Sequence, residues 1–184
     1  MLTLFGIGKR KISENKVANV LVNTLIEYCE NGFPEVVEVI NNSPEFSSSP
    51  NVDKEQYAEF LQILIVSNLN FLPHYLEPDI AARVQELVIE KFAGVFEVNP
   101  KELDDRLKEY KKFLTRINHP SKNMLYAMSK GMFYKYDLND YQNEEYFRNL
   151  QTPNPIFLKR LDDVMAQFIF NWDDFVAKYR VTAQ

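Results

Sequence analysis

Residues 53–72 read DKEQYAEFLQILIVSNLNFL, and this stretch decides the fold class. Asp53 and Gln56 stand three residues apart, the spacing of a capping box, which predicts that a helix begins directly after Asp53. The apolar residues of that helix recur mainly three and four apart: Tyr57, Phe60, Leu61, Ile63, Leu64, Ile65, Val66, Leu69 and Leu72. A helix that is apolar over so wide a face must be covered by other elements, so we expect the helix over 54–72 to be central.

Helical spacing also marks most of the remaining chain. Ser13 is a good N-cap for a first helix, and Asn31–Gly32 is a good C-terminal stop for it. Two Asn-Pro pairs, Asn99–Pro100 and Asn154–Pro155, place an N-cap before a proline, which is well tolerated as the first residue of a helix. The predicted helices besides the central one cover 14–30, a short stretch from Pro34, 79–94, Pro100 to about 117, 120–136, and Pro155 to about 179, which is the longest.

Two segments lack a clear helical pattern. Residues 42–53 are a loop rich in serine and proline, and 137–153 is an irregular segment with room for a short helix near 143–150. No alternating β-branched run bounded by turns is present. We therefore predict an all-α fold with about seven helices and little or no sheet. The fold would be a single-domain helical bundle or a stack of helical hairpins over 13–184, preceded by a basic arm over 1–12.

Composition narrows the function classes. The chain of 184 residues has a single cysteine, Cys29, which excludes an intramolecular disulfide and a CxxC metal or redox site. No apolar stretch is long enough to span a membrane, and the N-terminal apolar residues precede the basic ones, the reverse of a secretory signal. We expect a cytoplasmic protein. Its net charge of −5 is uneven, because acidic residues dominate 17–99 and basic residues dominate 100–136.

The segment LFGIGKRKIS, residues 4–13, raises the possibility of a phosphate-binding loop. A nucleotide P-loop needs Gly five residues before the Gly-Lys pair and Ser or Thr directly after the lysine, but Thr3 and Arg10 occupy these positions. A simpler anion site is still possible, in which the anion binds at the start of a helix at Ser13, next to Lys9, Arg10 and Lys11. The alternative is a solvated chain end.

A second basic group lies on the predicted helix from Pro100. Lys108, Lys112 and Arg116 fall on neighbouring parts of one surface, as phosphate-binding residues would. Two observations favour an ordinary solvated face instead. The pI is about 5.2, and acidic residues alternate with the basic ones at ion-pair spacing, as Glu109 does with Lys112. Nucleic-acid binding is therefore disfavoured but stays open.

Motifs for catalysis and metal binding fail on spacing. Neither His74 nor His119 belongs to a Glu-x-x-His or HExxH motif, so no metal is predicted. The stretch 137–148 resembles a calcium loop, but Gln142 replaces the required glycine and Arg148 replaces the final glutamate. Cys29 lies between Glu27 and Glu30, which raise a thiol pKa. We predict no catalytic residue and no cofactor; an enzyme stays open but is disfavoured.

The remaining signals concern partners. The last predicted helix keeps an unbroken apolar stripe, and methionine recurs at 124, 128 and 132, so either could be a seam for another protein or part of the core. We expect a non-enzymatic protein–protein interaction or adaptor domain that binds a partner protein or a second copy of itself. Such a domain should expose an apolar patch. The alternative is binding of an anionic ligand or nucleic acid through the N-terminal arm and the helix from Pro100.

Overall fold

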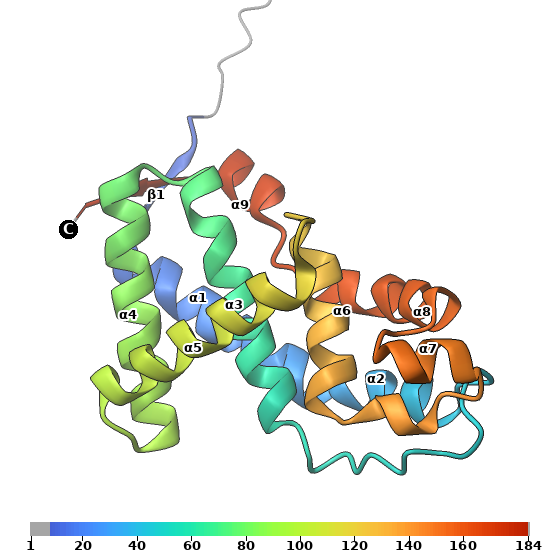
Figure 1. The fold of residues 1–184 in the computed structure, drawn as a ribbon. Helices are drawn as coiled ribbons and strands as arrows, with labels where there is room; N and C mark the ends of the chain where they lie inside the picture. Colours follow the sequence, from blue (N-terminus) through green and yellow to red (C-terminus); the bar gives the residue numbers. More distant parts are fainter. Residues whose placement is uncertain (1–7, 184) are drawn as a thin grey trace, which may run out of the picture.

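The computed structural model describes residues 8–183 and is helical over most of this range (Figure 1). The all-α class and the near-absence of sheet are confirmed. The α-helices are α1 Glu14–Glu27, α2 Phe33–Asn41, α3 Ala58–Tyr75, α4 Pro78–Phe96, α5 Pro100–Asn118, α6 Met124–Lys135, α7 Glu145–Leu150, α8 Pro155–Met165 and α9 Trp172–Lys178. A π-helical turn covers Tyr28–Gly32, 3₁₀ turns cover Leu138–Tyr141 and Ala166–Phe168, and the two strands are β1 Arg10–Ser13 and β2 Tyr179–Thr182.

Helix α3 lies at the centre of the molecule, as predicted. It packs against α1, α4, α5 and α6, which surround it in Figure 1. Its side chains from Phe60 to Leu69 are all buried, including the polar Ser67 and Asn68. The wide apolar face read from the sequence is therefore the main contributor to the core.

The start of α3 differs from the prediction. Asp53 N–H does donate to Gln56 Oε1 at 2.9 Å, but this bond closes a turn that precedes the helix. The helix begins only at Ala58, where the hydroxyl of Tyr136 accepts from Phe60 N–H at 3.2 Å and donates to Gln56 C=O at 2.6 Å. Tyr136, the residue directly after α6 (Met124–Lys135), thus supplies the cap that local sequence was expected to supply.

The stop predicted at Asn31–Gly32 is wrong. Gly32 keeps a right-handed backbone conformation, and the chain continues through the π-helical turn directly into α2. The glycine serves packing, because a Cβ at this position would lie 2.1 Å from Cε1 of Phe168. Close contact with an aromatic ring, and not a left-handed cap, explains why glycine occupies this position.

The single long helix predicted from Pro155 to about 179 is also wrong. The start is confirmed, since Asn154 Oδ1 accepts from Ile156 N–H at 2.8 Å. The helix then ends at Met165, and after a 3₁₀ turn a separate helix, α9, begins at Trp172. Asn68 of α3 causes the break: its side chain donates to Phe168 C=O at 3.0 Å and accepts from Phe170 N–H at 2.8 Å.

Helix α6 begins four residues later than predicted. Asn118, at the end of α5, donates to the carbonyls of Ser121 and Asn123 at 3.4 and 2.8 Å, which holds the connection in a non-helical conformation. Asn123 then caps α6, because its Oδ1 accepts from Leu125 N–H at 2.9 Å. Pro120 therefore belongs to the connection and not to the helix.

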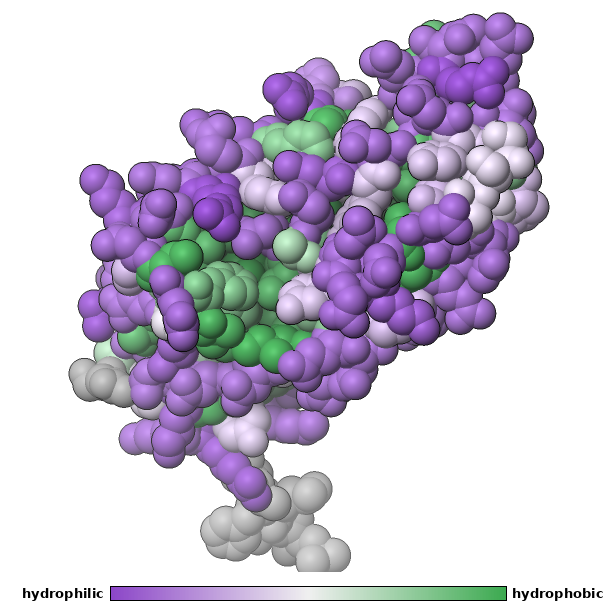
Figure 2. Space-filling model, turned by 90° about the horizontal axis from the view of Figure 1, so that it is seen from below, coloured by the Kyte–Doolittle hydropathy of each residue, from purple (hydrophilic) through white to green (hydrophobic). Residues whose placement is uncertain are grey.

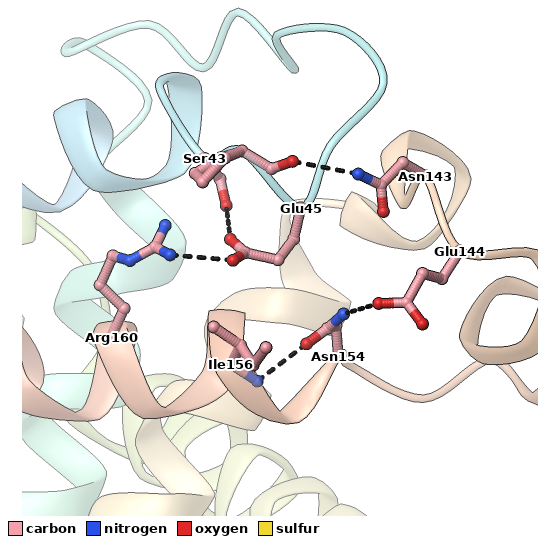
Figure 3. A network of polar contacts seen from close by, with 8 residues as sticks. Ser43, Glu45, Asn143, Glu144, Asn154, Ile156 and Arg160 are labelled. Atoms are coloured by element: carbon pink, nitrogen blue, oxygen red, sulfur yellow. Dashed lines mark hydrogen bonds and ion pairs between the residues drawn. The ribbon is translucent and has the colours of Figure 1, made fainter.

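The loop 42–53 and the irregular segment 137–153 hold each other in place (Figure 3). Arg160 of α8 donates to Glu45 at 2.9 Å, and Asn143 donates to Pro44 C=O at 3.0 Å. Burial alone would raise the pKa of Glu45, but hydrogen bonds from Ser43 and Arg160 outweigh it and lower the pKa. The polar residues of both segments thus form the hydrogen bonds that connect them. Helix α7 lies close to the short helix that was predicted near 143–150.

The two ends of the described chain meet in a small parallel sheet. Arg10 pairs with Tyr179 and Ser13 with Thr182, so β1 and β2 lie side by side next to α1 (Figure 1). Residues 10–12 of the predicted basic arm are therefore strand residues. Residues 1–7 of that arm, which include Phe5 and Ile7, lie outside the described residues.

Candidate functional site

An apolar groove lies where α1 and α4 end and α3 begins. It has a volume of about 540 Å³ and is formed by the last turn of α1 with the π-helical turn, the segment before α3, and the last turn of α4. Figure 2 views the molecule from below and shows an apolar hollow enclosed by hydrophilic side chains. The groove is lined by Ile26, Cys29, Glu30, Pro34, Lys54, Glu55, Tyr57, Leu61, Val95 and Phe96.

Two large side chains of the groove are unusually exposed. Val95 is 54% exposed and Tyr57 is 46% exposed. Val95 occupies the last turn of α4, and Tyr57 immediately precedes α3. Single exposed apolar residues are ordinary on protein surfaces, but here two of them border one hollow. Both side chains therefore give the groove exposed apolar surface.

The rim of the groove is mainly acidic. Glu30 and Glu55 line it beside a single lysine, Lys54, while Glu27 and Glu97 directly follow the lining residues Ile26 and Phe96. All four glutamates are exposed. Within residues 8–183 none of them belongs to an ion pair. Their charges are thus available to a partner.

Cys29 contributes apolar surface to the groove and is not a nucleophile. Burial, followed by the nearby charge of Glu30, raises the pKa of its thiol to about 12. The direction agrees with the sequence prediction, but burial is the larger cause. Because the thiol stays protonated at neutral pH, the reactive thiolate is essentially absent.

The N-terminal basic residues predicted as an anion site acquire partners from the other end of the chain. Lys9, Arg10 and Lys11 are exposed at β1, and β2 brings Arg180 opposite Lys11, with Lys178 close by. In the part of the chain that the structure describes, no carboxylate forms an ion pair with these five cations. We call them the terminal basic cluster. Sequence reasoning missed Lys178 and Arg180 because no local pattern indicates that residues 179–182 pair with the other end of the described chain.

Ser13 does not form an anion site with these residues. Its Oγ accepts from Lys16 N–H at 3.4 Å and caps α1, which confirms the predicted N-cap. The next residue, Glu14, is buried in the first turn and lies 3.9 Å from Arg83. A carboxylate therefore already occupies the positive end of the helix dipole, and it would repel an incoming anion.

The second predicted basic group, on α5, is largely neutralised by its own helix. Lys108 lies 2.6 Å from Asp104 and Lys112 lies 2.8 Å from Glu109. The guanidinium of Arg116 lies 5.9 Å from the centre of the Phe113 ring. In Figure 1, α5 crosses in front of α3, whereas β1 lies at the top of the molecule, so the two predicted groups do not form one site.

A polar cluster between α3, α5 and α6 is structural. The hydroxyl of Tyr110 donates to Glu59, and Lys135 Nζ lies 3.4 Å from the same carboxylate and 4.3 Å from the centre of the Tyr110 ring. Burial, followed by the hydrogen bond to Glu59, raises the pKa of Tyr110. These side chains satisfy one another and link three helices.

Comparison with models of protein families, with curated proteins and with solved structures finds no match to the chain. No helix within residues 8–183 is both long and apolar enough to cross a membrane. Over the same residues, no three or more His, Cys, Asp or Glu side chains gather in a group that could hold a metal ion.

Proposed function

We propose that the protein is a non-enzymatic helical interaction domain that binds an apolar segment of a partner in the groove between α1, α3 and α4. The observation that carries this proposal is the hollow bordered by the exposed Val95 and Tyr57. Its volume of about 540 Å³ lies within the range of binding pockets, roughly 300–1,000 Å³. A cytoplasmic location belongs to the proposal and is consistent with a lone, unpaired cysteine.

The groove chemistry specifies the partner. Ile26, Leu61 and Phe96 offer apolar contacts, so the partner segment needs two or more apolar anchors. The unpaired carboxylates of Glu30 and Glu55 favour Lys or Arg next to these anchors, because opposite charges at a rim speed association and select the register. The partner is thus an apolar segment flanked by basic residues.

Selection from a random peptide library displayed on phage tests this proposal. Selected peptides should combine apolar anchors with Lys or Arg, and Val95→Lys should weaken their binding by about tenfold or more, because it removes an apolar contact and repels basic residues. Val20→Lys is the matched control, since Val20 is 37% exposed on α1 and does not line the groove. Peptides that bind the Val95→Lys protein as well as the natural one would refute the proposal.

The terminal basic cluster favours a second function, binding of an anionic ligand or nucleic acid. Five exposed cations gather on or directly beside two adjacent strands, and they make a stronger positive surface than the sequence indicated. A gel-shift assay with nucleic acid at low salt should then show binding, and combined alanine substitution of Lys9, Arg10 and Lys11 should weaken it. Substitution of Lys178 and Arg180 should weaken it as well. Absence of a shift at low salt would exclude nucleic acid as the ligand.

A further inference from the structure

The chemistry that the groove requires of its partner occurs in the chain itself. Apolar residues dominate 2–7, where Leu2, Leu4, Phe5 and Ile7 stand close together, and the cations Lys9, Arg10 and Lys11 follow at once. We infer, on the basis of the proposed function, that the groove of one copy binds residues 2–7 of a second copy.

Charge complementarity supports this pairing. Apolar anchors of the segment would enter a hollow lined by Ile26, Leu61 and Phe96. The basic residues that follow the anchors would then face the exposed, unpaired Glu30 and Glu55 of the rim. Each half of the contact has exposed charges that lack ion-pair partners within residues 8–183.

The positions of residues 2–7 and of the groove favour binding between two copies over binding within one copy. Residues 1–7 precede Gly8 and β1, which leads into the N-terminal end of α1, whereas the groove lies at the C-terminal end of α1. Helix α1 has 14 residues and therefore spans about 21 Å. A seven-residue segment reaches about 24 Å at full extension, so it would have to fold straight back along the whole helix. The groove of another copy imposes no such path.

The assembly that follows is head-to-tail. Each copy offers its segment to one neighbour and its groove to another, and such a heterologous contact produces rings or open chains. A contact made by one short segment buries little surface, so it should be weak and dependent on concentration. It should also weaken as salt rises, because the rim charges are exposed.

Sedimentation velocity on mixtures of two full-length variants tests the inference. One variant carries Leu4→Ser, Phe5→Ser and Ile7→Ser, which removes the anchors but leaves the groove. The other carries Val95→Lys, which alters the groove but leaves the segment. Each variant alone should stay monomeric, and the mixture should form a one-to-one complex that does not grow further, because only one contact per pair is intact. The natural chain and the Val20→Lys control should form larger species as concentration rises.

The outcomes separate the inference from the function on which it rests. A monomeric natural chain at all concentrations, or a mixture without a complex, would overturn the inference. Self-association of the Val95→Lys variant as strong as that of the natural chain would overturn it too, since another surface would then be responsible. If library peptides still bind the groove in either case, the proposed function stands with a different partner.

Discussion

At the scale of single residues, Asn68 shows how one polar side chain can redirect a whole segment. It is fully buried in α3 and donates to Leu64 C=O at 2.9 Å, in addition to its two bonds with Phe168 and Phe170. Because a buried backbone group without a partner is costly, the chain between α8 and α9 is held in the one conformation that Asn68 satisfies.

Asn68→Ala should therefore destabilise the fold by about 3 kcal/mol, because Phe168 C=O and Phe170 N–H would lose their partner inside the core. Urea denaturation followed by circular dichroism measures this change. Asn70→Ala on the same helix is the control and should change the unfolding free energy by less than about 0.5 kcal/mol, as partly exposed positions usually do. Equal effects of the two substitutions would contradict this account.

Replacement by alanine should have opposite effects on stability at Gly32 and at Gly94. A Cβ at Gly32 would collide with the Phe168 ring, so Gly32→Ala should cost about 2 kcal/mol through forced repacking. A Cβ at Gly94, in α4, meets nothing within 4 Å, so Gly94→Ala should stabilise by about 0.5–1 kcal/mol. Thermal melts of both variants provide the measurement, and a tolerated Gly32→Ala would refute the close-contact explanation.

At the scale of elements, some helix boundaries are set by local caps and others by residues from distant parts of the chain. Asn99 and Asn154 cap α5 and α8 locally, and both starts were predicted. Tyr136 caps α3 and Asn68 ends the α8 segment, and both act from distant parts of the sequence. Those two boundaries were missed because no local pattern contains the residue that decides them.

Removal of the distant cap tests this explanation. Tyr136→Phe keeps the ring but deletes the hydroxyl that contacts Phe60 N–H and Gln56 C=O, so it should cost about 1 kcal/mol. Amide hydrogen exchange should quicken in the first turn of α3 before it changes elsewhere. Tyr126→Phe is the control, because Tyr126 is exposed on α6, the helix that Tyr136 directly follows. Unchanged protection at the start of α3 would show that the hydroxyl is not the cap.

At the scale of the whole molecule, two partly buried phenols, Tyr110 and Tyr136, should make the fold sensitive to alkali. Burial raises the pKa of Tyr136, and burial together with Glu59 raises the pKa of Tyr110, above the ordinary value of 10.0. The folded state thus keeps these protons to higher pH than the unfolded state does. The contribution of these two phenols to the free energy of unfolding is fully present below about pH 10 and is lost as the pH rises above it.

Denaturation midpoints measured at increasing alkaline pH check this expectation. Above about pH 10 the free energy of unfolding should fall with a slope that approaches about 1.4 kcal/mol per pH unit for each such phenol. Tyr110→Phe should reduce this slope by the contribution of one phenol. A stability that is constant from neutral to strongly alkaline pH would contradict the expected effect of the buried phenols.

The candidate site was only partly predictable from the sequence. Lys9, Arg10 and Lys11 were identified, but Lys178 and Arg180 join them only through a parallel pairing between the two ends of the described chain. The groove could not be predicted, because its walls come from the ends of three helices. Exposure of Val95, for example, depends on how α4 packs and not on its local pattern.

The most direct test of the groove as the binding site is methyl NMR on the natural chain during titration with a synthetic peptide of residues 1–13. The account predicts that methyl resonances of Ile26, Leu61 and Val95 shift progressively while those of Val20 stay in place. A peptide with Leu4, Phe5 and Ile7 replaced by serine should leave all four unchanged. Shifts that centre on another surface, or no shifts at saturating peptide, would contradict the account.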